Sequence, residues 1–251
     1  MTSSRNIQFT LVLLLAIILI PSLVFGVTVP TVSFGIEEAE SPQQVSTALQ
    51  ILFLLTILSI APAILLMTTC FTRIVIVLGF VRQAMGTQNM PPTQVLVGLS
   101  LFLSFFIMSP VISDINDNAL QPYLGEQISQ DQALDKALDP MRNFMFNQVG
   151  EEELALLSDI TLDEEPFSQE DIPTLTLIPA FMLSEMKKAF QMGFMIYVPF
   201  LVIDMIVASI LMSMGMMMLP PVIISMPFKL LLFVLVDGWG LVVGSLIKSF
   251  S

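Results

Sequence analysis

The sequence predicts an all-α, membrane-associated protein: two hairpins that contain four long apolar helices, with a small helical insert between the hairpins. Three observations predict this class. Of the 251 residues, 55% are hydrophobic and 12% are charged, with a mean hydropathy of +0.86. Several apolar runs are long enough to cross a bilayer. The acidity is local, because the segment Asp114 to Asp171 holds 15 acidic and two basic residues, a net charge of −13.

Composition also excludes several classes of function. Cys70 is the only cysteine and there is no histidine, which removes an intrachain disulfide, zinc-type sites and Ser-His-Asp triads. No nucleophile, base and orienting group occur together in a recognisable pattern, so we expect no enzyme and no cofactor. No basic stripe is available to neutralise phosphates, so we expect no nucleic acid.

Residues 1–26 resemble a secretory signal peptide. Arg5 is the positive residue, Thr10 to Ile20 is a nearly unbroken apolar core, and Pro21 ends it before a small-residue cleavage site at Gly26. The alternative is an uncleaved first membrane helix. We favour cleavage because the run is short and a polar stretch follows, so residues 27–44 are predicted to form a short periplasmic segment.

Residues 45–113 predict the first hairpin. Ala48 to Phe71 is an uncharged stretch of 24 residues, enough for one span. It contains Pro62 and continues to Arg82, so the helix must tilt and kink or lie partly outside lipid. A polar turn over 83–92 leads to a second apolar helix over 94–111.

Residues 114–174 are predicted to form the acidic insert. We expect it on the periplasmic side, because the chain begins there after signal cleavage and crosses the membrane twice in the one intervening hairpin. Residues 130–139 have helical spacing, Pro140 could begin a further helix, and 163–173 is typical of a loop. The simplest interpretation of its charges is a solvated face.

Residues 175–251 predict the second hairpin, with helices over 175–211 and 222–247. An Asp or Lys at the centre of a spanning helix costs about 2.5–3.5 kcal/mol. The embedded charges should therefore face a protein interface, a wet cavity or no lipid. Helical spacing puts Glu185 and Lys188 on one face, and also Lys229 and Asp237. The six embedded residues are Glu185, Lys187, Lys188, Asp204, Lys229 and Asp237.

The segment Leu211 to Pro221 contains five methionines, with Gly215 in the middle and a Pro-Pro pair at the end. Glycine and proline here predict a tight loop between two helices. Flexible, polarizable methionines can close a gap and reshape around a guest, or they can fill an irregular core. The residues alone leave both interpretations open.

Several sequence blocks stand out, over roughly residues 50–112 and 178–240. They are LLMTTCFTR (65–73) continuing to Arg82 and Gly86, PPTQ (91–94), LFLSFFIMSP (101–110), IPAFMLSEMKKAF (178–190) continuing through Asp204, the methionine loop, and Lys229 to Trp239. These blocks resemble the FliP family of export-gate membrane proteins, which belong to the bacterial flagellar type III secretion apparatus.

The resemblance implies a non-enzymatic role. Several copies would associate with FliQ-type and FliR-type partners into a helical, ring-like gate in the inner membrane and flagellar basal body, with FlhA-type and FlhB-type components nearby. Unfolded flagellar subunits would pass through the centre, and a large part of the assembly would lie on the periplasmic side.

The resemblance also assigns residues. Met216, Met217 and Met218 match a methionine gasket that seals the channel, and Glu185 and Lys229 match a salt bridge between neighbouring subunits. Arg73 and Arg82 match an arginine pair expected to serve packing or interfaces. Lys187, Lys188, Asp204 and Asp237 are expected to be structural or interface charges.

Two other functions stay open at this stage. An ion or small-solute transporter would use Asp204, Asp237 and Glu185 as coupling sites within the membrane, although no internal repeat is visible. A structural scaffold would organise partners without lining a pore.

Overall fold

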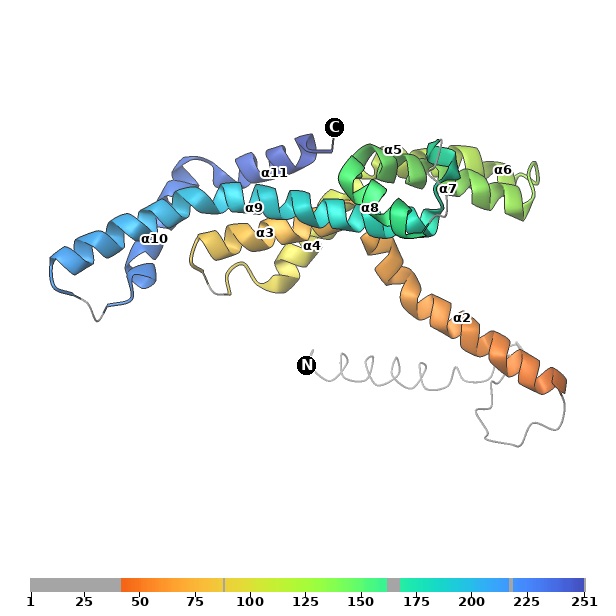
Figure 1. Ribbon diagram of the computed structural model, residues 1–251, viewed down its shortest axis with the longest axis horizontal. Helices are drawn as coiled ribbons and strands as arrows, with labels where there is room; N and C mark the ends of the chain where they lie inside the picture. Colours follow the sequence, from red (N-terminus) through yellow and green to blue (C-terminus); the bar gives the residue numbers. More distant parts are fainter. Residues whose placement is uncertain (1–41, 88, 162–167, 217–218, 251) are drawn as a thin grey trace, which may run out of the picture. The chain divides into compact units, whose positions relative to one another are not determined.

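The structure is a computed structural model that describes residues 42–87, 89–161, 168–216 and 219–250. These residues are helical, with no strand among them (Figure 1). The predicted signal peptide (1–26) and residues 27–41 lie outside the described part. The elements are α2 (Pro42–Met67), α3 (Phe71–Ala84), α4 (Thr93–Ile107), α5 (Ser109–Ile115), a π-helical turn η1 (Asn116–Leu120), α6 (Gln121–Leu124), α7 (Gln130–Gln148), α8 (Glu151–Thr161), a 3₁₀ turn η2 (Gln169–Asp171), α9 (Thr174–Ser213), α10 (Pro221–Leu235) and α11 (Gly238–Lys248).

The chain divides into two compact units, Met1–Phe53 and Leu54–Ser251, and α2 crosses the boundary between them. Two helical segments are long and apolar enough to span a membrane, Leu49–Met67 and Thr174–Ser213. Two bent helix pairs raise the number to four if each pair is one span: α4 with the segment 109–124, bent by 56°, and α10 with α11, bent by 63°. The predicted class, all-α with long apolar helices and a helical insert, is confirmed.

The core of the second unit lies between α3 and α9. Helix α3 packs along the first part of α9 (Figure 1), and α7 and α8 of the insert pack against the same helix. Fully buried residues of α3 recur with helical spacing at Ile74, Val77, Leu78 and Val81, which is the pattern of one core-facing stripe. A smaller cluster around Phe181 joins the insert to α9.

The first apolar helix is not continuous to Arg82, because the chain breaks between Met67 and Phe71. Thr68 and Thr69 donate side-chain hydrogen bonds to the carbonyls of Ile64 and Leu66, at 3.0 and 3.2 Å. These bonds satisfy carbonyls of the last turn of α2. Pro62, where a kink was expected, lies inside α2.

The last apolar helix is also divided, because α10 ends at Leu235 and α11 begins at Gly238. Asp237, between them, has a left-handed backbone with φ +50°. Such a conformation cannot continue a right-handed helix. Lys229 and Asp237 therefore do not share one helix face, unlike the prediction from their spacing.

Residue Pro140 does not begin a new helix in the insert. It lies inside α7, which runs unbroken from Gln130 to Gln148 and starts with a capping box at Ser129 and Gln132. Helix α7 continues past the lost hydrogen bond at Pro140 to Phe144 and Met145, which pack against α9.

Candidate functional site

The most deeply buried charges form an ion pair between α3 and α9. Arg73 Nε donates to Glu185 Oε2 at 2.9 Å, and Arg73 Nη2 donates to Glu185 Oε1. The two side chains are 1% and 0% exposed. A buried pair is tolerated only when both groups have excellent geometry and further hydrogen bonds, and here the bidentate arrangement supplies the geometry.

The remaining donors of Arg73 also have partners. Nη2 donates to Gln148 Oε1 at 3.0 Å, and Nη1 donates to both the carbonyl and the hydroxyl of Ser249, each at 2.9 Å. The guanidinium carbon lies 3.8 Å from the centre of the Phe250 ring. One cation thus connects α3 with α9, α7 and the end of α11.

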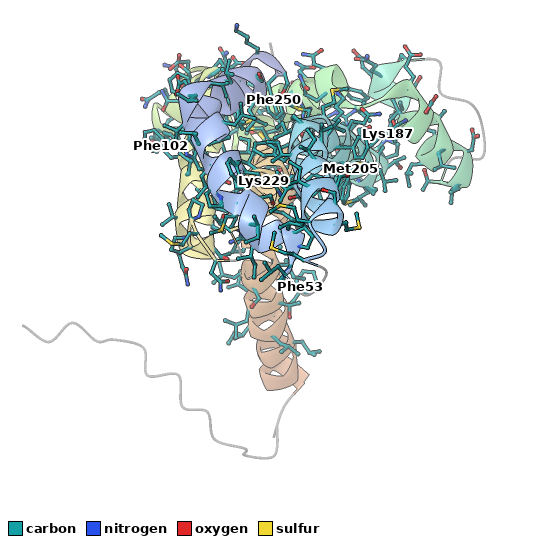
Figure 2. The ribbon with its side chains drawn as sticks, turned by 90° about the vertical axis from the view of Figure 1, so that its left-hand side faces the viewer. Phe53, Phe102, Lys187, Met205, Lys229 and Phe250 are labelled. Carbon is teal, nitrogen blue, oxygen red and sulfur yellow. The ribbon has the colours of Figure 1, made fainter. Side chains whose placement is uncertain are left out.

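A second pair links α9 to α10. Lys229 Nζ donates to Asp204 Oδ2 at 2.6 Å, and Ser225 Oγ donates to Asp204 Oδ1. Lys229 is 2% exposed and Asp204 is 19% exposed. Figure 2 labels Lys229 on α10. Glu185 and Lys229, expected to pair between subunits, each have a different partner within this chain; their contact between subunits stays a prediction.

Two lysines of α9 attach the insert. Lys187 Nζ donates to the carboxylates of Glu152 and Glu153, at 2.8 and 2.7 Å. This hydrogen bond from Lys187 lowers the pKa of Glu153. Lys188 Nζ donates to the backbone carbonyl of Gln148 at 2.6 Å, so it caps the end of α7 and does not bond to Glu185.

The other predicted charges lie at turns. Arg82 Nη1 donates to Thr93 Oγ1 at 3.0 Å and to the Pro91 carbonyl at 3.4 Å, which holds the turn between α3 and α4. Asp237 is exposed at the bend between α10 and α11.

The methionine loop begins with a Schellman turn at the end of α9. Gly215 has φ +76°, the Met216 N–H bonds to the Leu211 carbonyl at 3.0 Å, and the Gly215 N–H bonds to the Met212 carbonyl at 3.0 Å. Pro221 begins α10 at its first position. Met212 and Met214 are exposed and Met216 is half-buried, whereas Met217 and Met218 lie outside the described residues.

The carboxylates considered for a transport site do not converge. Glu185 pairs with Arg73, Asp204 pairs with Lys229, and Asp237 lies at the exposed bend. Among the described residues, no group of three or more metal-ligating side chains could hold an ion. This arrangement therefore does not favour a transporter over a helical subunit whose buried charges are paired within the chain.

The chain matches the FliP family over residues 54–246, about three quarters of its length. The chain belongs to the FliP family. It is 57% identical over 216 residues to the flagellar biosynthetic protein FliP of Bacillus subtilis (strain 168), covering 86% of this chain and 98% of that relative.

Other FliP proteins are similarly close. The flagellar biosynthetic protein FliP of Pectobacterium carotovorum subsp. carotovorum is 51% identical over 208 residues, covering 83% of this chain and 81% of that protein. The FliP of Treponema pallidum (strain Nichols) is 46% identical over 224 residues, covering 88% and 83%.

Sequence reasoning missed the partners of Arg73. Gln148 and Ser249 lie 75 and 176 residues from it, and neither belongs to a motif of the family blocks. It also missed the contact between Cys70 and Ser104, whose Sγ and Oγ are 3.2 Å apart. Burial raises the pKa of the Cys70 thiol to about 11, and the side chain is 0% exposed, which is typical of a structural cysteine.

Proposed function

We propose that this chain is a core subunit of the flagellar type III protein export gate, with its methionine loop on the path of exported subunits. Family membership supports a component of flagellar biosynthesis. The observation that carries the finer proposal is the loop itself. A Schellman turn at Gly215 ends α9, and Met212 and Met214 are exposed on the last turn and at the C-cap of this helix.

The physical basis is the chemistry of methionine. A ring formed by Met216, Met217 and Met218 from several copies would make a dry, apolar constriction that resists ions. The same unbranched side chains would deform around the varied side chains of an unfolded substrate. A gasket of this kind needs a homo-oligomer, because one loop cannot surround a pore.

The assembly we propose contains FliQ-type and FliR-type subunits, with FlhA-type and FlhB-type components beside it. Its place is the bacterial inner membrane within the flagellar basal body, and unfolded flagellar proteins are its cargo. The exposed apolar surface of α9 and α10 is consistent with coverage by lipid or partner helices, because an aqueous surface of that composition would aggregate.

A cross-link tests the channel assignment. In a Cys70→Ser background, a single cysteine replaces Met217, and a secretion substrate with its own cysteine is stalled during export. Phe102→Cys is the control, because Phe102 is 72% exposed on α4 (Figure 2). An adduct at position 217 and none at position 102 supports the proposal. If no adduct forms in cells that still export, the methionines pack within the core and the chain is a scaffold that does not line the channel.

The acidic insert is proposed to contact rod components or ring neighbours on the periplasmic side. Leu156 and Ile160 are 54% and 72% exposed and lie one helical turn apart on α8. Exposed aliphatic pairs on a charged insert are suited to a protein contact. Leu156→Ser with Ile160→Ser should reduce gate assembly without loss of the folded subunit; normal assembly and normal export would contradict this role.

A further inference from the structure

The chain returns to its own core after α11. The guanidinium of Arg73 lies against the Phe250 ring, and its Nη1 donates to the Ser249 carbonyl. Gln148 Nε2 donates to the Phe250 carbonyl at 3.4 Å. The Phe250 ring stacks on Phe144 of α7, with centroids 6.4 Å apart and planes 22° apart.

These contacts meet where the insert joins α9. Gln148 is the last residue of α7, and its carbonyl accepts from Lys188 of α9. Two residues later, the Gly150 N–H donates to Ser184 Oγ of α9 at 2.7 Å. The junction between α7 and α8 therefore contacts both α9 and the end of α11.

Arg73 couples the contact with α9 to the contact with the end of α11. Its planar fork distributes its donors over Glu185, Gln148 and Ser249, and each direction is fixed relative to the others. If Ser249 and Phe250 moved away, Nη1 would lose both of its acceptors, and the guanidinium would lose the ring that covers it. Gln148 would also lose an acceptor. An unsatisfied buried donor is costly, so the guanidinium and Gln148 would have to rearrange.

We propose that Ser249 and Phe250 form an intramolecular strap that fixes Arg73 and thereby ties the base of the insert to the α3–α9 core. The strap is a property of the single subunit and holds whether or not the chain lines an export channel. Displacing it loosens the junction of α7 and α8 and leaves the outer turns of α7 unchanged.

Hydrogen exchange on the purified full-length protein tests the strap. In Phe250→Ala, the backbone amides of residues 145–150 should exchange about five- to tenfold faster, as expected when the ring stacking on Phe144 and the cation–π contact with Arg73 are lost. Residues 130–139 of the same helix should exchange at the native rate. Phe250→Tyr keeps the stacked ring and should restore native exchange at 145–150.

The matched control is Leu241→Ala, since Leu241 lies on α11 and is 60% exposed. Equal exchange at 145–150 in Phe250→Ala and Leu241→Ala would overturn the strap, and so would equal acceleration over 130–139 and 145–150. If Phe250→Ala does not accumulate, Ser249→Ala removes the hydroxyl acceptor of Arg73, together with the hydrogen bond that this hydroxyl donates to the Leu246 carbonyl. It should accelerate the same amides by a smaller factor, and no change there would also overturn the proposal.

Discussion

The two halves of α9 differ both in sequence and in surroundings: the first half carries Glu185, Lys187 and Lys188, whereas Asp204 is the one charged residue of the more apolar second half. From Thr174 to Gly193 the helix packs against the insert and α3, and eight residues are buried: Thr176, Leu177, Ala180, Phe181, Ser184, Glu185, Ala189 and Gly193. From Phe194 to Ser213 only Phe200 and Leu211 are buried. Met205, labelled in Figure 2, is 69% exposed.

The difference shows which surfaces the chain completes by itself. The first half contributes to a core that is covered within the single chain, and the charge of Glu185 is paired there with Arg73. The second half presents an apolar surface that lies open in the single chain and includes a groove of about 400 Å³ between α9 and α10. For a member of the FliP family, substitutions in the first half should affect the folded subunit, and those in the second half should affect assembly or lipid contact.

The largest effect is expected from the buried ion pair. Glu185→Ala leaves Arg73 buried without its carboxylate, which should reduce the free energy of unfolding in detergent by about 3–5 kcal/mol. Thermal unfolding followed by circular dichroism measures this. Met205→Ala in the second half should leave the subunit within about 0.5 kcal/mol of the native protein; comparable losses for both variants would remove the distinction between the halves.

Charge swaps separate the intrachain pair from the predicted pair between subunits. Arg73→Glu with Glu185→Arg should partly restore the folded monomer if the intrachain pair dominates. Glu185→Lys with Lys229→Glu should partly restore oligomer assembly if the pair between subunits exists. If the second double swap assembles no better than either single variant, the predicted pairing between subunits fails.

Phe181 and Phe194 form a matched aromatic comparison on the two halves. Phe181 is 0% exposed and contacts Phe144 edge-on with centroids 5.9 Å apart, while Phe194 is 62% exposed. Phe181→Ala should destabilise the subunit by about 3–4 kcal/mol because it opens a cavity. Phe194→Ala should leave the unfolding temperature unchanged and reduce co-purification with partner subunits.

Two glycines should respond to alanine with opposite signs. A Cβ on Gly193 would overlap the Phe80 ring of α3, while a Cβ on Gly79 would meet nothing within 4 Å. Gly193→Ala should destabilise by about 1–3 kcal/mol through overpacking. Gly79→Ala should stabilise by up to about 1 kcal/mol through helix propensity. Denaturant unfolding of both variants measures the difference, and a shared sign would show that α3 and α9 are less closely packed.

The smallest effect concerns pH. The pKa of Glu153 lies below its ordinary value of 4.5 because Lys187 stabilises the carboxylate. Its contribution is therefore present above pH 4.5 and is lost as the pH falls through the lowered pKa. Proteolysis of α8 in the native protein should stay constant between pH 6 and 4.5 and should accelerate as the pH falls below 4.5. Glu153→Gln should show a smaller change over the same range, and identical profiles would contradict the role of this pair.

Sequence reasoning could predict the helices and the need for buried charges to be paired, but not which charges pair. Hydropathy and spacing locate α9, and the cost of a charge in lipid predicts protected positions for Glu185 and Lys229. Arg73 and Glu185 are 112 residues apart, and no local period links them. The bend at Asp237 was detectable, since Asp-Gly is a turn signal, but the surrounding apolar residues favoured a continuous helix. The break before Phe71 has no glycine or proline to mark it.

Helix α9 is also long enough to act as a lever, with Pro199 inside its second half. Its 40 residues correspond to about 60 Å at 1.5 Å per residue. The insert and Arg73 pack against its first half, and the turn at Gly215 ends it at the methionine loop. From Gly193, where the packed half ends, to Ser213 the helix is about 30 Å long, so a tilt of about 5° there would displace the far end by about 2.6 Å, half a helical turn. A change of tilt among the buried partners of Arg73 would therefore be larger at the methionines than at its origin.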